Sequence, residues 1–190
     1  MQMTTEEMKF ALLKHFRYLN YPMVATECTM IVPDSRYGSP SFTADILAIK
    51  QTLMVEVEIK QHRYEFASDL KTKPEKHAFY LTHKSPWDNR YEFWEKGMIR
   101  PHKFYFAYHL SPRNKHVHNA AYYPDLPAPY GLIIVYDLYD CRILKRAKWL
   151  HRDIIHLQAA KDRMCTRLVK ENIYLKQNEY DRKEDQELPK

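Results

Sequence analysis

Two carboxylates and a lysine on neighbouring predicted strands are the residues best placed to do chemistry. Phe42–Lys50 and Leu53–Lys60 are rich in apolar, β-branched residues and are separated only by Gln51 and Thr52, which predicts a β-hairpin. If the turn is centred between Gln51 and Thr52, Asp45 faces Glu58 across the hairpin. Facing carboxylates repel each other. A divalent cation between them would remove that repulsion, because hard cations prefer oxygen ligands.

The alternation of residues in the second strand places a lysine on the same face as these acids. Side chains of a strand point to opposite faces in turn, so Glu56, Glu58 and Lys60 share one face. Val55, Val57 and Ile59 point to the other face, which we expect to be the core. Lys60 would then lie beside a water molecule bound to the cation. The alternative is an exposed sheet face on which these charged side chains are simply solvated.

Asp45 followed thirteen residues later by Glu58-Ile59-Lys60 resembles the motif of the PD-(D/E)XK nuclease superfamily. The resemblance extends, in order, from about Pro22 to Leu150 and is closest to MmcB-like DNA-repair proteins and related phage proteins. Its further matches are Phe66, Asp69, Lys73, Phe104-Tyr105-Phe106-Ala107, Gly131-Leu132-Ile133, Ile143 and Ala147. Two positions depart from the family pattern, since Ala44 stands where proline is usual and Thr43 where arginine is usual.

The resemblance implies an α/β, restriction-endonuclease-like fold, with a mixed central sheet flanked by helices. It also implies a metal-dependent nuclease that hydrolyses DNA phosphodiester bonds in repair, recombination or phage DNA metabolism. Mg²⁺ or Mn²⁺ would be held by Asp45, Glu58 and the backbone carbonyl of Ile59, with Glu27 of the preceding strand as an additional ligand. The metal would polarise the phosphate and activate a water molecule.

The remaining expected roles belong to residues that follow the metal ligands. Lys60 would position the water or stabilise the charge that develops on phosphorus, and Gln61 would orient the site by hydrogen bonding. Lys71, Lys73 and Lys76 would neutralise DNA phosphates. A second basic face, with Arg163, Arg167 and Lys170, is the alternative DNA-binding surface.

Two other functions stay open at this point. One is a non-catalytic nucleic-acid-binding or scaffolding protein that retains the nuclease fold. The other is an RNA endonuclease of the tRNA-splicing type, which needs no metal and uses a Tyr/His/Lys set. Convergence of Asp45, Glu58 and Lys60 on one metal-sized gap would favour the metal-dependent nuclease.

Periodicity and turn residues predict the other elements. Thr4 caps a first helix and forms a capping box with Glu7, and this helix ends at Asn20-Tyr21-Pro22. The segment 81–100 is irregular. The remaining predictions are strands over Met23–Val32, Phe104–His109, Leu132–Tyr136 and Cys141–Leu144, a short helix over Arg63–Thr72 that ends near Pro74, and a long helix from Leu157 to about Lys176. We expect one domain over residues 1–176 and a charged, disordered tail over 177–190.

Composition narrows the class of protein. Three glycines disfavour glycine-rich phosphate loops, and three scattered cysteines disfavour a disulfide framework, so a reducing, cytoplasmic compartment is expected. No apolar run is long enough for a membrane span, and the polar first residues do not resemble a signal peptide. The net charge of +6 suits a polyanionic partner such as DNA. His116 and His118 are expected in a solvated loop, and a homodimer is one oligomeric state left open.

Overall fold

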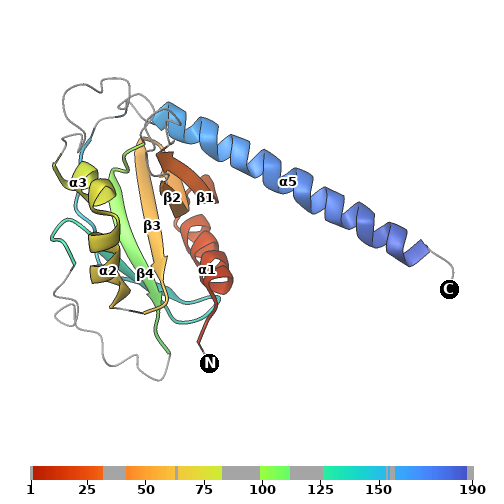
Figure 1. Ribbon diagram of the computed structural model, residues 1–190, viewed down its shortest axis with the longest axis horizontal. Helices are drawn as coiled ribbons and strands as arrows, with labels where there is room; N and C mark the ends of the chain where they lie inside the picture. Colours follow the sequence, from red (N-terminus) through yellow and green to blue (C-terminus); the bar gives the residue numbers. More distant parts are fainter. Residues whose placement is uncertain are drawn as a thin grey trace.

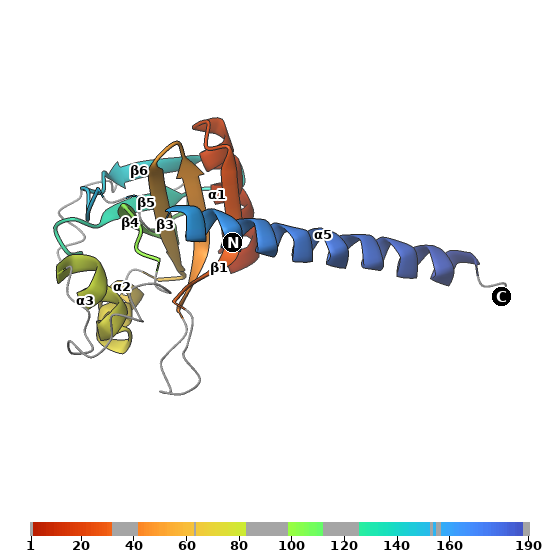
Figure 2. The same ribbon diagram turned by 90° about the horizontal axis from the view of Figure 1, so that it is seen from above.

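The computed structural model describes residues 2–31, 42–62, 64–82, 99–111, 126–152, 154 and 157–187. These residues form one six-stranded mixed sheet with helices on both faces (Figures 1 and 2). The elements are α1 (Thr5–Tyr18), β1 (Met23–Ile31), β2 (Phe42–Lys50), β3 (Leu53–Lys60), α2 (Glu65–Thr72), α3 (Pro74–Thr82), β4 (Lys103–His109), β5 (Gly131–Val135), β6 (Cys141–Lys145) and α5 (Leu157–Glu187). The predicted α/β class, with a mixed central sheet flanked by helices, is confirmed.

The strands lie in the order in which they occur in the chain. β1, β2 and β3 form an antiparallel meander, β3, β4 and β5 are parallel, and β6 returns antiparallel to β5. In the β2–β3 hairpin, Ile46 pairs with Val57 and Lys50 pairs with Leu53, so the predicted register is confirmed. The parallel pairing of β3 with β4 places Lys60 next to Tyr108, near the C-terminal ends of both strands.

Both faces of the sheet are covered by helices, which decides where the site can lie. Val55, Val57 and Ile59 pack with α1 in one apolar cluster, as the alternation predicted. Met54, Phe104 and Phe106 pack on the other face in a second cluster with residues of α2, α3 and α5, among them Phe66, Tyr80 and Met164. The face of β3 that carries Glu56 and Glu58 is therefore also buried, under α2 and α3.

Two predictions about helices and two about loops can be compared with the structure. The predicted capping box is present, since the Thr4 hydroxyl accepts a hydrogen bond from the backbone N–H of Glu7 and the Glu7 carboxylate accepts one from the backbone N–H of Thr4. The helix expected to end near Pro74 is instead followed by α3, which begins at Pro74, because proline is well tolerated at the first position of a helix. The segment predicted to be irregular, 81–100, and the histidine loop lie largely outside the described residues.

α5 continues well beyond the predicted end of the last helix. It runs to Glu187 and projects past the body of the molecule, so the prediction of a disordered tail is wrong for residues 177–187 (Figure 1). Glutamate, lysine, glutamine and arginine dominate this stretch, and all four are strong helix formers. Among the described segments, no helix is both long enough and apolar enough to cross a membrane.

The basic face of α5 has a structural role near its beginning. Arg163 donates hydrogen bonds to the carbonyls of Thr29 and Met30, each at 3.0 Å, and Arg167 donates one to the carbonyl of Thr26 at 3.3 Å. All three carbonyls belong to the edge strand β1. Arg163 and Arg167, which belong to the alternative DNA-binding face, thus also hold α5 on this edge and shield it.

Gly131, at the beginning of β5, is required by close packing. A Cβ atom there would overlap the ring of Tyr105 and lie 2.8 Å from the backbone nitrogen of Ala147. We therefore expect Gly131→Ala to lower the free energy of unfolding by about 1–3 kcal/mol, the usual cost of overpacking a core. Urea unfolding of the variant tests this, and an unchanged midpoint would show that the Tyr105 ring moves aside freely.

Candidate functional site

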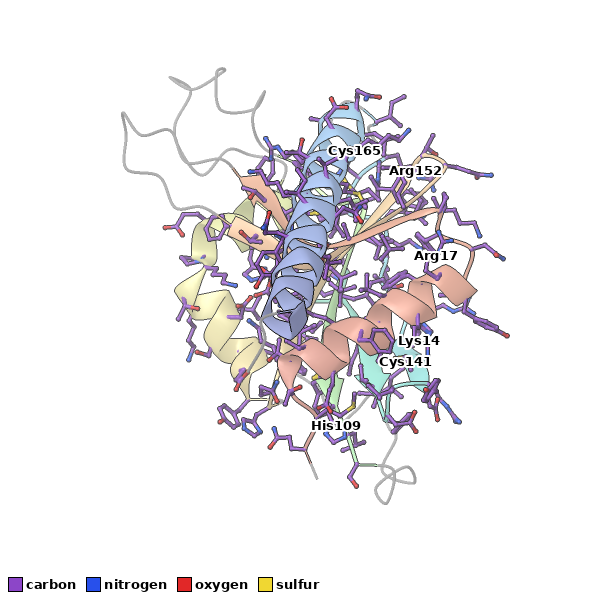
Figure 3. All side chains as sticks on the ribbon, turned by 90° about the vertical axis from the view of Figure 1, so that its right-hand side faces the viewer. Lys14, Arg17, His109, Cys141, Arg152 and Cys165 are labelled. Carbon is purple, nitrogen blue, oxygen red and sulfur yellow. The ribbon has the colours of Figure 1, made fainter. Side chains whose placement is uncertain are left out.

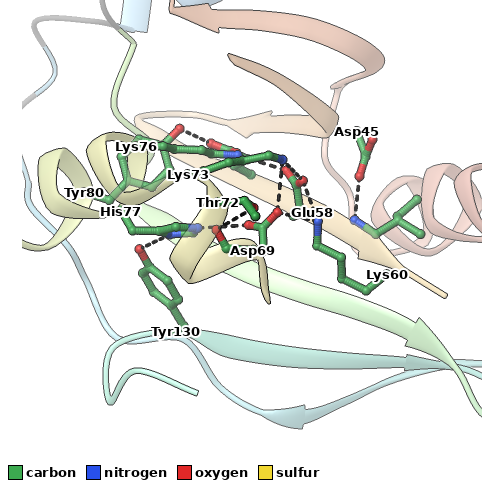
Figure 4. Close-up of polar contacts among 12 residues, drawn as sticks. Asp45, Glu58, Lys60, Asp69, Thr72, Lys73, Lys76, His77, Tyr80 and Tyr130 are labelled. Carbon is green, nitrogen blue, oxygen red and sulfur yellow. Dashed lines mark hydrogen bonds and ion pairs between the residues drawn. The ribbon is translucent and has the colours of Figure 1, made fainter. Parts of the chain in front are cut away.

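Asp45 of β2 reaches across to β3 at the position that the hairpin register predicts. The backbone pairing of β2 with β3 runs from Lys50–Leu53 to Ile46–Val57, and Asp45 and Glu58 are the next residues along. There the Asp45 carboxylate, through Oδ2, accepts a hydrogen bond of 2.6 Å from the backbone N–H of Ile59 (Figure 4). The side chain of Asp45 thus replaces a main-chain partner where the two strands separate.

The electrostatic environment of the Asp45 carboxylate favours the binding of a cation beside it. Burial, and then the negative charge of Glu58, raise the pKa of Asp45 from its ordinary 3.8 to about 6. Glu27 raises it further, while the hydrogen bond from Ile59 and the charge of Lys60 act in the opposite direction. In the metal-free protein, the nearby positive charge is therefore too small to offset the effect of burial and of the neighbouring acids on the ionised Asp45 carboxylate.

This raised pKa predicts how stability depends on pH in the absence of metal. Because the folded protein binds the Asp45 proton more tightly than the unfolded chain does, Asp45 costs nothing below about pH 4 and destabilises the fold increasingly as pH rises to about 6. Asp45→Asn removes this cost. We expect the variant to gain stability relative to the wild type between these pH values, as measured by urea unfolding with EDTA. A difference that does not change with pH would contradict the assigned environment.

Glu27 lies on β1, opposite Asp45. Thr26 pairs with Ile46 and Cys28 pairs with Ala44, which places Glu27 between these pairs and Asp45 across from it. Its φ of 52° is in the left-handed region, which is unusual for a non-glycine residue in a strand and typical of functional positions. The Glu27 carboxylate forms an ion pair with Lys9 of α1. Glu27, Asp45 and Glu58 thus form a row across three adjacent strands, although Glu27 turns toward α1.

Glu58 is surrounded by three ammonium groups. Its carboxylate pairs with Lys60 at 3.0 Å, with Lys76 at 2.9 Å and with Lys73 (Figure 4). Burial alone would raise the pKa of Glu58, but Lys76, Lys60 and Lys73 outweigh it and lower the pKa to about 2. The side chain is only 5% exposed. The alternative of an exposed, solvated sheet face is therefore wrong.

A second carboxylate, Asp69 of α2, completes the surroundings of Lys60. Asp69 Oδ1 lies 2.5 Å from Lys60 Nζ and 3.1 Å from Lys73 Nζ, and Oδ2 lies 2.9 Å from His77 Nε2. His77 Nδ1 in turn lies 2.8 Å from the hydroxyl of Tyr130. Figure 4 shows this chain of contacts running from Lys60 to Tyr130. Asp69 and Lys73 were identified through the family resemblance alone, and the sequence gives no signal for His77 or Tyr130.

Lys76 of α3 lies inside the protein, not on a DNA-binding surface. Its side chain is completely buried and pairs with Glu56 at 2.7 Å as well as with Glu58. The hydroxyl of Tyr80 donates a hydrogen bond of 2.6 Å to Glu56. The prediction that Lys76 contacts DNA phosphates is wrong, because no phosphate reaches a fully buried ammonium group. Lys73 is directed into the same network, with its side chain 30% exposed, and Lys71 is exposed to solvent.

Gln61 points away from the acids. Its side-chain amide lies 2.7 Å from the Thr5 hydroxyl at the beginning of α1. Gln61 therefore joins α1 to the end of β3. The prediction that it orients the Glu58 site is corrected by this contact.

The donor set fits a hard divalent cation in residue type and register, but the side chains do not converge. Asp45, Glu58 and the carbonyl of Ile59 lie at one end of the hairpin, and Asp45 lacks positive charge. Within the described ranges, however, no group of three or more His, Cys, Asp or Glu side chains is arranged to hold a metal ion. A cation entering here would have to compete with the lysines for Glu58.

Comparisons with known proteins establish the fold and leave the function open. No family model and no curated protein matches the chain. A protein of unknown function from Silicibacter pomeroyi, SPO1766, has a similar structure, with a TM-score of 0.55 and 16% sequence identity. The match covers 90% of this chain and 89% of that one. The two proteins therefore share a fold over almost their whole lengths.

Proposed function

We propose that this chain is a divalent-metal-dependent nuclease that hydrolyses DNA phosphodiester bonds, in DNA repair, recombination or phage DNA metabolism. The observation that carries the proposal is the row of three acids, Glu27, Asp45 and Glu58, across β1, β2 and β3. The pKa of Asp45, which burial and the charge of Glu58 raise, supports it, because a bound cation would stabilise the ionised carboxylate. The resemblance of Asp45 and Glu58-Ile59-Lys60 to the PD-(D/E)XK motif also supports it.

Each residue of the site has a distinct task in this proposal. Asp45, Glu58 and the Ile59 carbonyl would hold Mg²⁺ or Mn²⁺, with Glu27 as an outer ligand. A bound metal would supply Lewis-acid polarisation of the phosphate and would activate a water molecule near neutral pH. Lys60 provides positive charge where negative charge develops in the transition state. Asp69 holds the Lys60 ammonium at 2.5 Å and so fixes its direction.

A second candidate is a nucleic-acid-binding protein that has lost catalysis while keeping the fold. The specific observation in its favour is the set of three lysines on Glu58, which already neutralise the ligand that a metal would need. The two candidates differ in whether a divalent cation displaces one of these ammonium groups. Lys73 is the most exposed of the three and is therefore the one most easily displaced.

The RNA endonuclease of the tRNA-splicing type has less support. The structure does bring His77 and Tyr130 into the network of Lys60. His77 is 3% exposed and Tyr130 is completely buried, so neither side chain is accessible to an RNA strand.

Incubation of the protein with labelled single-stranded, duplex and branched DNA tests the proposed function. We expect cleavage of at least one substrate with Mn²⁺ and none with EDTA. Cleavage that persists in EDTA would instead favour a metal-independent mechanism. Binding without cleavage of any substrate in Mn²⁺ would favour the non-catalytic candidate.

A further inference from the structure

The segment from β6 to Arg152 is a basic part of the described surface that lies outside the site. Residues 141–152 contain five arginines and lysines and no aspartate or glutamate. An exposed tryptophan, Trp149, lies among them with 43% of its surface accessible. Lys103 Nζ, from the beginning of β4, lies 5.4 Å from the centre of the Trp149 ring, and the Arg152 guanidinium lies 5.7 Å from it. We call Lys103, Lys145, Lys148, Trp149 and Arg152 the Trp149 patch.

The backbone of the patch is held firmly on the body of the protein. Lys148 N–H donates to the carbonyl of Pro129 at 2.9 Å, and Leu150 N–H donates to the carbonyl of His102 at 2.8 Å. Ala147, Leu150 and His151 are buried, while Lys148, Trp149 and Arg152 are exposed. This segment therefore presents its cations and its aromatic ring from a fixed scaffold, which lowers the entropic cost of binding. Figure 3 shows Arg152 near the beginning of α5, at the opposite end of the body from His109.

The positive charges of the patch are not neutralised by carboxylates of the described residues. Across the described part of the chain, Lys103, Lys145, Lys148 and Arg152 form no ion pair with an aspartate or glutamate. Burial and the neighbouring charge of Lys148 lower the pKa of Lys145. A group of positive charges without such ion pairs would be stabilised by an anionic partner.

We propose that the Trp149 patch binds single-stranded nucleic acid, with Trp149 stacking on a base and the surrounding cations contacting the phosphates. An aromatic platform combined with cations is the arrangement that binds single strands without reading their sequence. An anionic membrane surface fits less well, because interfacial binding uses a broad apolar face. The patch offers a single ring with Lys103 and Arg152 close to it.

The patch is separate from the carboxylate site. Lys103 pairs with Val55 near the beginning of β3, whereas Glu58 and Lys60 lie at its other end. At about 3.3 Å per residue, roughly 10 Å of strand separates Val55 from Glu58, and roughly 17 Å separates it from Lys60. Binding at the patch therefore does not depend on cleavage chemistry, and loss of one function leaves the other testable.

Fluorescence anisotropy with a labelled oligothymidylate, in EDTA, tests the proposal. We expect Trp149→Ala to weaken binding about 5-fold or more, the lower end of the loss when one stacking ring is removed. Trp149→Phe should retain most of the affinity, since a ring remains. Lys148→Ala and Arg152→Ala should each reduce the slope of log K against log salt by about 0.7, one lost contact with a single strand.

The matched control is Lys14→Ala, which removes a positive charge on α1 outside the patch and should leave the salt slope unchanged. Circular dichroism confirms that each variant is folded. Equal affinity of the wild type and Trp149→Ala would overturn the proposal, as would tighter binding to phosphatidylserine vesicles than to the oligonucleotide. Tight oligonucleotide binding in EDTA, together with no cleavage of any DNA substrate in Mn²⁺, would support the patch while rejecting the nuclease proposal.

Discussion

Lys60→Ala is expected to slow Mn²⁺-dependent DNA cleavage by about 10²–10³-fold, while Mn²⁺ affinity stays the same or increases. This fall in rate is the usual effect of removing one group that stabilises the negative charge developing in the transition state. The fold should survive, because Glu58 keeps Lys73 and Lys76, and Asp69 keeps Lys73 and His77. Removing one positive charge beside Glu58 also favours Mn²⁺ binding, because that charge would repel the metal ion. Single-turnover cleavage and calorimetric Mn²⁺ titration of the same preparation measure both effects.

Lys71→Ala is the matched control, because Lys71 is an exposed lysine of α2. It should leave the single-turnover rate of bound substrate unchanged. Loss of Mn²⁺ binding in a folded Lys60→Ala variant would contradict the assigned roles. Full activity in that variant would do so too, since it would show that the ammonium group plays no part in the reaction.

Lys76→Met is expected to destabilise the protein by about 3–5 kcal/mol, the usual cost of breaking a buried ion pair from one side. The side chain of Lys76 is fully buried between Glu56 and Glu58. Methionine has a similar length and no charge, so the variant leaves Glu56 with the Tyr80 hydroxyl as its remaining contact in the network. Urea unfolding measures the loss.

A second substitution separates charge from packing in this experiment. Glu56→Gln added to Lys76→Met removes the buried charge that the single variant leaves unpaired, so part of the stability should return, with a coupling of about 0.5–3 kcal/mol. Lys71→Met, on the surface of α2, should have little effect. If Lys76→Met unfolds at the same urea concentration as the wild type, the buried lysine does not stabilise the network in the way its contacts indicate.

The same network changes how a variant of Glu58 should be interpreted. Considered from the hairpin alone, Glu58→Gln relieves repulsion with Asp45. In the folded protein it instead leaves Lys60, Lys73 and Lys76 without their shared carboxylate. A loss of activity in Glu58→Gln would therefore combine a lost metal ligand with a disturbed fold. Asp45→Asn avoids this difficulty, because its amide oxygen can still accept the hydrogen bond from Ile59.

Local patterns were sufficient to predict the part of the site that lies on the hairpin. The alternation in β3 and the short turn fix which residues face each other, so the position of Asp45 beside Glu58 followed from the sequence. The partners supplied by α2 and α3 did not follow, because they depend on how helices distant in the sequence pack on β3. Pro74 resembled the end of a helix, and the burial of Lys76 became evident only when α3 was placed over Glu56.

Sequence patterns also do not show with which of several neighbouring groups a polar side chain will pair. Glu27 lies opposite Asp45, the position expected of a metal ligand. Its carboxylate nevertheless pairs with Lys9 of α1. Gln61 follows Lys60 directly but turns to Thr5. Both outcomes depend on the position of α1, which the hairpin motif does not specify.

Comparison of DNA cleavage by the wild type and Asp45→Asn in Mn²⁺ is the measurement that tests the central claim most directly. Asp45→Asn removes a proposed metal ligand while relieving repulsion, so a loss of activity cannot be attributed to unfolding once urea denaturation shows a stable variant. The account predicts cleavage by the wild type and no detectable cleavage by the variant. Equal cleavage by both proteins would contradict it, because the row of acids across β1, β2 and β3 would then have no part in the reaction.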